Sequence, residues 1–142
     1  MTTIELSDAL AFERTLRRLA HQILENNDPE TLILAGILRR GVPLAERLAE
    51  MVNAFGGVRP QVETLDITLY RDDLTELAAQ PDVRPARFSC LVEGKTVILV
   101  DDVIYTGRTA RAAMDAVIHM GRPARIRLAV ICLLYTSPSP RD

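Results

Sequence analysis

Two adjacent carboxylates, Asp101 and Asp102, stand directly after the apolar run at residues 97–100. A short apolar run bounded by turn residues indicates a buried parallel strand. The acids then lie at the carboxyl end of that strand, where open α/β sheets bind their ligands. Because burying two adjacent acids is costly without a ligand or partner, the pair predicts a ligand site. The alternative is an ordinary crossover in which the aspartates only cap the next helix.

A Thr-Gly-Arg-Thr turn at residues 106–109 follows the acids and opens a helical pattern. The free N–H groups and positive dipole end of a helix N-terminus attract phosphate. Two hydroxyls and a guanidinium add donors, and Gly107 lets the backbone approach closely. Acids that accept hydrogen bonds from sugar hydroxyls, beside a phosphate-binding turn, suit a sugar phosphate.

A second candidate anion site is the Arg39-Arg40-Gly41 sequence, which leaves another apolar run at residues 31–37. On most loops two arginines are simply solvated. Here a phosphate turn follows a second strand, so we expect two anion sites at neighbouring strand ends. Such an arrangement suits a substrate with a phosphate at one end and a diphosphate at the other.

Alternating helical and strand patterns predict a doubly wound α/β domain with a mostly parallel sheet. The long stretch 71–93 has no clear period and reads as a functional loop. The expected helices cover residues 8–26, 42–55 and 108–120, and the expected strands cover residues 31–37, 61–70, 96–100 and 125–133.

The composition places the chain among ordinary single-domain proteins. The 142 residues include 17 basic and 19 acidic side chains, so the net charge of −2 gives no global signal for nucleic-acid binding. The two cysteines, Cys90 and Cys132, match no metal-ligand spacing and are expected to be reduced thiols. With no signal core and no bilayer-spanning run, we expect a cytoplasmic protein that does not bind membranes.

Four stretches resemble the type I phosphoribosyltransferases. Together they resemble one subfamily, the bifunctional pyrimidine operon attenuation proteins and uracil phosphoribosyltransferases. The Asp-Ile-Thr-Leu-Tyr-Arg-Asp-Asp run at residues 66–73 is the most specific to this subfamily, and the resemblance covers nearly all of residues 3–133. The four stretches are residues 36–45, 65–74, 101–109 and 121–126.

The resemblance implies transfer of a phosphoribosyl group from 5-phosphoribosyl-1-diphosphate to uracil, giving UMP and diphosphate. Mg²⁺ would be bound mainly through the substrate diphosphate, without a dedicated set of protein ligands. Asp101 and Asp102 would be the catalytic acids that hold the ribose. The implied substrate-binding residues are Arg39, Arg40 and Gly41 for the diphosphate, Arg71 on a lid, and Tyr105, Thr106, Gly107, Arg108 and Thr109 for the 5′-phosphate. A strained or cis peptide near Leu38–Arg39 is also implied.

The resemblance further implies an RNA-binding face on the first helix, formed by Arg17, Arg18 and His21, for the leader RNA of pyrimidine operons. Taken alone, these residues read as ordinary surface side chains. Two alternatives therefore stay open. The chain could be an RNA-binding attenuation regulator whose nucleotide site is only a sensor, or a phosphoribosyltransferase for a purine base.

The last residues depart from the family pattern. Family members continue with segments that form the uracil pocket, whereas residues 134–142 are rich in proline and serine and show no apolar period. We expect residues 1–133 to be a partial phosphoribosyltransferase domain, incomplete at its C-terminus. Residues 134–142 would be a foreign or disordered tail, or else a natural flexible terminus. On this interpretation the chain transfers to uracil weakly or not at all, and the complete domain forms homo-oligomers.

Overall fold

A sheet of four parallel strands forms the centre of the molecule. The computed structural model describes residues 2–70, 87–102 and 107–130. The sheet order is β2-β1-β3-β4, and every described pairing is parallel. The strands are β1 (Leu32–Ile37), β2 (Gln61–Leu65), β3 (Thr96–Asp101) and β4 (Arg125–Val130). The predicted parallel α/β fold is therefore confirmed.

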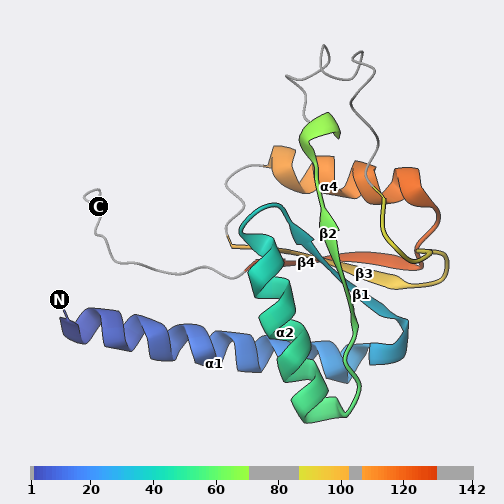
Figure 1. Cartoon of the computed structure of the whole chain (residues 1–142). Coiled ribbons are helices and arrows are strands. Elements are labelled where there is room, and N and C mark those ends of the chain that lie inside the picture. Colours follow the sequence, from blue (N-terminus) through green and yellow to red (C-terminus); the bar gives the residue numbers. More distant parts are fainter. Residues whose placement is uncertain (1, 71–86, 103–106, 131–142) are drawn as a thin grey trace.

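Helices cover both faces of this sheet (Figure 1). Helices α1 (Thr2–Asn26) and α2 (Gly41–Gly56) pack on one face, and α4 (Gly107–Met120) packs on the other. Short 3₁₀ turns, η1 (Pro29–Thr31) and η2 (Thr68–Tyr70), precede β1 and follow β2. The positions of all three helices match their predictions within a turn, except that α1 begins earlier.

Alternation along the two central strands divides the core into two layers, because successive side chains of a strand point to opposite faces. Leu32, Leu34, Ile98 and Val100 pack with the buried stripes of α1 and α2. Ile33, Ala35, Val97 and Leu99 pack against α4, whose buried residues next to the sheet are mostly alanines. Small side chains let this helix lie close to the strands. Because β1 and β3 are covered on both faces, they read in the sequence as continuous apolar runs.

The second strand is shorter than the sequence predicted. The strand expected over residues 61–70 ends at Leu65. The carboxylate of Asp66 accepts a hydrogen bond from the backbone N–H of Thr68 at 3.0 Å, which bends the chain into η2. The expected strand at residues 125–133 is confirmed over Arg125–Val130. Residues 131–133 lie outside the described part, as does most of the predicted loop, at residues 71–86.

The strand order places a topological switch point between β1 and β3. From β1 the chain passes outward to β2, whereas β3 and β4 lie on the other side of β1. Helices that leave the two central strands therefore cover opposite faces of the sheet, and in sheets of this kind the diverging connections leave a crevice. In doubly wound sheets, ligands bind in this crevice beyond the carboxyl ends of the strands. The fold thus selects the ends of β1 and β3 as the candidate site.

Candidate active site

The site is built by two strand ends and the helix N-termini that follow them. Residues 38–40 connect β1 to α2, and the chain after Asp102 leads from β3 to α4. Neither helix has an acidic residue in its first turn, so no carboxylate there competes for the free N–H groups. The structure thus places two helix N-termini, which in general favour anions, at the adjacent strand ends where the sequence predicts two anion sites.

Asp101 is the last residue of β3 and is 9% exposed. One of its carboxylate oxygens accepts a hydrogen bond from the backbone N–H of Asp102 at 2.8 Å. Burial, the largest cause, and the adjacent Asp102 carboxylate together raise the pKa of Asp101 from 3.8 to about 6. The Asp102 N–H and the charge of Arg40 act in the opposite direction. Because burial removes water from the Asp101 carboxylate, a ligand hydroxyl that donates a hydrogen bond to it would replace the lost hydration.

An ion pair joins the two halves of the site. The Arg40 guanidinium lies 3.2 Å from an Asp102 carboxylate oxygen, with the arginine side chain 81% exposed and the aspartate side chain 22% exposed. The contact crosses the switch point, from the loop after β1 to the end of β3. The structure therefore brings together Arg40, Asp101 and Asp102, which the sequence assigned to one site from two separate motifs.

Close backbone packing explains the glycine after the two arginines. A Cβ atom on Gly41 would collide with the carbonyl oxygen of Val100, at the end of β3. A Cβ on Gly36 would lie 2.6 Å from the carbonyl oxygen of Gly41. The start of α2 therefore sits directly on the two central strands. The peptide bond between Leu38 and Arg39 is cis, as the resemblance implied.

The remaining predicted substrate-binding residues are only partly described. Gly107 and Arg108 begin the first turn of α4, where the sequence predicts a phosphate-binding turn, and Thr109 follows with its side chain half-buried. Arg39 lies exposed in the connection between β1 and α2, next to Arg40. The other three predicted residues, Arg71, Tyr105 and Thr106, lie outside the described residues.

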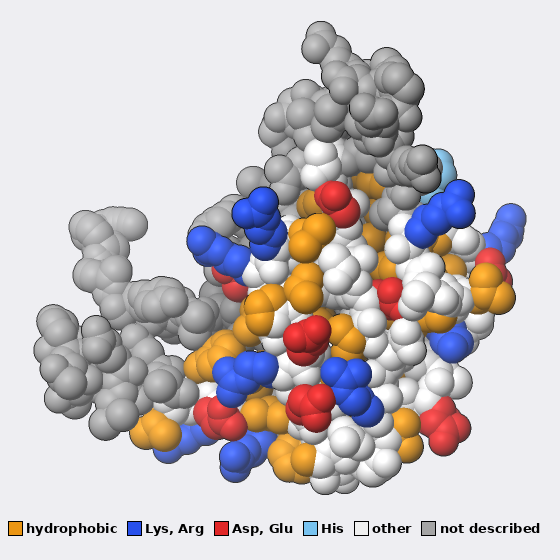
Figure 2. Space-filling model, in the orientation of Figure 1, with side chains coloured by type: hydrophobic (Ala, Val, Ile, Leu, Met, Phe, Trp, Pro, Cys, Tyr) orange, Lys and Arg blue, Asp and Glu red, His pale blue; other side chains and the backbone are white. Residues whose placement is uncertain are grey.

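The predicted RNA-binding residues lie together on α1, apart from the acids. We call the exposed residues Arg14, Arg17, Arg18 and His21 the basic stripe. At 3.6 residues per turn they fall within a sector of roughly 100°, on the side of the helix away from the buried Leu16. On the face of the molecule that Figure 2 shows, basic and acidic side chains are interspersed among the described residues. The stripe is therefore a local feature rather than part of one large basic field.

Sequence reasoning missed a buried carboxylate on β2. Glu63 is 8% exposed and accepts hydrogen bonds from the Ser89 hydroxyl at 2.6 Å, the Ser89 N–H at 3.1 Å and the Gln61 amide at 2.7 Å. Burial raises the pKa of Glu63, but these bonds outweigh burial and hold the pKa below its ordinary value of 4.5. Glu63 thus fastens the segment at residues 87–92 to the sheet. In a strand of alternating apolar and polar residues, a polar residue is predicted to be exposed. The sequence therefore gives no signal that Glu63 is buried and bonded to Ser89.

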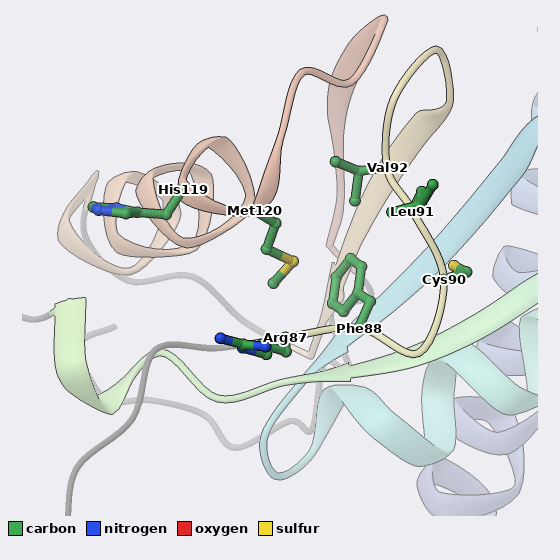
Figure 3. A pocket seen from close by; sticks show the side chains of 7 residues that line it. All are labelled: Arg87, Phe88, Cys90, Leu91, Val92, His119 and Met120. Atoms are coloured by element: carbon green, nitrogen blue, oxygen red, sulfur yellow. The ribbon is translucent and has the colours of Figure 1, made fainter.

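A hollow of about 360 Å³ lies between residues 87–92 and the C-terminal end of α4 (Figure 3). Its lining is mainly apolar, with Phe88 and Met120 at its centre and Arg87 and His119 at one side. The acids, in contrast, lie near the N-terminal end of α4, and a helix of 14 residues is about 20 Å long. The hollow is therefore separate from the candidate active site.

The fold and the paired strand-end loops are those of a known class. A family model described as the phosphoribosyl transferase domain matches residues 3–141, a range that includes most of the predicted tail. The chain therefore belongs to the phosphoribosyltransferase family.

More particularly, the chain is similar to proteins named bifunctional protein PyrR. It is 54% identical over 127 residues to the one from Clostridium novyi (strain NT) and 54% identical over 128 residues to the one from Thermus aquaticus. Each match covers 89% of this chain and 71% of the relative. The resemblance proposed from the sequence motifs is confirmed.

Solved structures agree on the fold. A purine phosphoribosyltransferase from Pyrococcus horikoshii Ot3 superposes with a TM-score of 0.61 at 23% identity, covering 91% of this chain and 78% of that one. A hypoxanthine phosphoribosyltransferase from Staphylococcus aureus gives a TM-score of 0.63 at 13% identity, covering 84% and 61%. At these identities the likeness concerns the fold alone, so it does not assign a base. Among the described helices, none has the length and apolar character needed to cross a membrane.

Proposed function

We propose that this chain carries the site for phosphoribosyl transfer from 5-phosphoribosyl-1-diphosphate to uracil, which yields UMP and diphosphate. The observation that carries the proposal is the meeting of Asp101, Asp102 and Arg40 at the switch point, between two helix N-termini. One helix N-terminus would take the 5′-phosphate and the other the diphosphate, with the ribose over the acids. The sequence similarity to bifunctional PyrR proteins supports this choice of reaction.

The reaction would proceed mainly through positioning and electrostatics. The bond from the ribose anomeric carbon to the diphosphate oxygen breaks and a bond to the uracil nitrogen forms. The proton of that nitrogen passes to the departing diphosphate or to water. The anomeric carbon carries partial positive charge in the oxocarbenium-like transition state. Asp101 and Asp102 would hold the ribose hydroxyls and stabilise this charge, while Arg40 would leave Asp102 to meet the diphosphate.

The donor groups of the site fit a magnesium ion that is held through the substrate. No cluster of three or more possible metal ligands occurs among the described residues. Asp101 and Asp102 are the carboxylates of the candidate site, and Mg²⁺ is commonly bound by one or two carboxylates together with substrate phosphates. When bound, Mg²⁺ would neutralise charge on the leaving diphosphate.

The test compares UMP formation by the chain completed with the C-terminal segment of a PyrR relative with that of the same completed chain carrying Asp101→Asn and Asp102→Asn. If the acids hold the ribose, turnover per folded molecule falls in the variant. If they only cap α4, the variant loses thermal stability while its turnover per folded molecule stays unchanged. Parallel reactions with hypoxanthine, guanine and adenine test the purine alternative, and faster transfer to any of these bases than to uracil would refute the choice of base.

A second candidate function, binding of pyrimidine-operon leader RNA, is favoured by the basic stripe. The stripe faces away from the core, and within the described residues the ion pair of Arg17 is a long one, 3.8 Å to Glu13. If the three arginines of the stripe contact phosphates of single-stranded RNA, the salt slope is roughly −2 in log affinity against log salt. Replacing Arg17, Arg18 and His21 by alanine should weaken binding to the leader and flatten that slope. Equal, weak binding of the unmodified chain to leader and scrambled RNA would refute this function.

A further inference from the structure

The outer side of the α1–α2 pair carries a planar stack of two rings. The His21 imidazole lies against the Phe55 ring with centroids 4.2 Å apart and planes 9° from parallel. His21 comes from α1 and Phe55 from the last turn of α2, so packing of the two helices creates the pair. Both residues are exposed, with 42% of Phe55 accessible to solvent.

Exposure of this phenylalanine is unusual for this chain. Among the described residues, the other aromatic side chains, Phe12, Tyr70 and Phe88, are half-buried and pack against the two core layers. A Cβ atom on Gly56, the next residue, would meet the end of the Leu24 side chain at 2.6 Å, so the two helices pack closely here. The end of α2 is thus held tightly on α1, while the Phe55 ring remains outside the core.

The surroundings of the stack match a polyanion with flat groups. His21 is itself a member of the basic stripe, so the stack adjoins three arginines on the same side of α1. Arg14 and Arg18 take part in none of the ion pairs of the described residues, and the Glu13 carboxylate is shared between Arg17 and Arg47. Glu25 is the exposed acid of the same helix side, one turn further on. Cations beside a planar aromatic surface are the two components of single-strand recognition.

We propose that the His21–Phe55 stack is a docking site for an unpaired base of RNA, with the arginines of the basic stripe contacting the adjacent phosphates. This inference rests on the second candidate function and names the chemistry of its site. A base that has left its own stack extends the ring pair, which rigid duplex RNA cannot do because its bases are already paired and stacked. The surface therefore discriminates unpaired from paired RNA, while its arginines act on both.

The chain contains no tryptophan, which makes a direct test possible. A Phe55→Trp variant keeps a ring in the stack and introduces a single tryptophan, whose emission can be excited selectively over that of the three tyrosines. Titration with a 12-nucleotide oligouridylate should quench its emission, whereas a hairpin duplex of equal charge should change the emission much less. Unchanged emission at oligouridylate concentrations that saturate binding would overturn the proposal.

A second variant measures the energetic effect. Stacking of one base contributes about 5- to 150-fold in affinity, so Phe55→Leu should weaken oligouridylate binding by a factor in this range and leave its salt slope unchanged. An Arg17→Ala, Arg18→Ala variant should instead weaken oligouridylate and duplex alike and flatten both salt slopes. Leu91→Ala, which shortens an exposed apolar side chain outside the α1–α2 pair, is the matched control. Thermal melting establishes that each variant is folded.

The outcomes separate the inference from the function on which it rests. If Phe55→Leu binds oligouridylate like the unmodified chain while the arginine variant does not, RNA binding stands and the stacking site is refuted. If the unmodified chain binds neither the leader nor the oligonucleotides at moderate salt, RNA binding itself is refuted. A selective loss for oligouridylate in Phe55→Leu, with Leu91→Ala unchanged, supports the proposal.

Discussion

Replacing Asp101 by asparagine should stabilise the folded protein at neutral pH while impairing the site. Burial raises the pKa of this carboxyl from 3.8 to about 6, so its charged form is less favourable in the folded chain than in the unfolded chain. The folded chain therefore binds more protons than the unfolded chain between these two values. The free energy of unfolding consequently falls as pH rises from about 4 to 6, and the full cost is present above pH 6.

The size of this effect follows from the pKa difference. A shift of about 2 units corresponds to about 3 kcal/mol at most. Solvent near the strand end and the exposed Arg40 guanidinium screen the charge, which reduces the expected gain for Asp101→Asn to roughly 1–2 kcal/mol at pH 7.5. Asparagine retains an oxygen that can accept the Asp102 N–H. For a chain of this size the melting temperature should rise by roughly 3–6 °C.

Differential scanning calorimetry at pH 7.5 and pH 4.5 measures this prediction. The gain should be present at pH 7.5 and mostly absent at pH 4.5, where the native carboxyl is already largely protonated. Asp115→Asn, at an exposed position of α4, is the control and should change neither melting temperature. A stabilisation of Asp101→Asn that is equal at both pH values, or no stabilisation at pH 7.5, would refute the reasoning.

Three further predictions concern the other contacts. Arg40→Gln removes the ion pair with Asp102, and because the arginine is exposed, the free energy of unfolding should change by less than about 1 kcal/mol. The affinity for 5-phosphoribosyl-1-diphosphate should nevertheless fall in calorimetric titration. Unchanged affinity would exclude Arg40 from the site. Glu63→Gln should lower the free energy of unfolding by about 1–3 kcal/mol at pH 7 in urea denaturation, because it disrupts the bonds to Ser89. Since the pKa of Glu63 lies below 4.5, its contribution is present above that pH and lost as pH falls through the folded value, so the difference should shrink in acid; a constant difference would contradict this. Replacing the residues of the basic stripe by alanine should leave affinity for 5-phosphoribosyl-1-diphosphate unchanged, and a marked loss would place the stripe in the substrate site.

The parts of the molecule that the sequence predicted are those that local patterns determine. The central strands are buried on both faces and therefore read as apolar runs, and the following helices begin near the arginine and threonine-glycine motifs. Asp101, Asp102 and Arg40 could be placed together because the carboxyl ends of parallel strands meet at one edge of a sheet.

The features that the sequence did not predict depend on contacts between distant segments. The end of β2 at Leu65 is fixed by the Asp66 turn, which an alternating pattern does not distinguish from continued strand. The burial of Glu63 requires Ser89, 26 positions further along the chain. The stack on Phe55 exists only because α2 crosses α1.

The central claim is that the turn at residues 106–109 and the strand-end acids bind a sugar phosphate. Titration calorimetry with 5-phosphoribosyl-1-diphosphate in the presence of Mg²⁺ tests it most directly, comparing the unmodified chain with a Thr106→Ala, Thr109→Ala variant. Each hydroxyl lost as a donor to a charged phosphate is worth roughly 1.5–3 kcal/mol, so affinity should fall by at least about tenfold. Thr15→Ala on α1, where the hydroxyl only donates to the Ala11 carbonyl, should bind like the unmodified chain. Equal affinity in the folded double variant and the unmodified chain would contradict the assignment of the site.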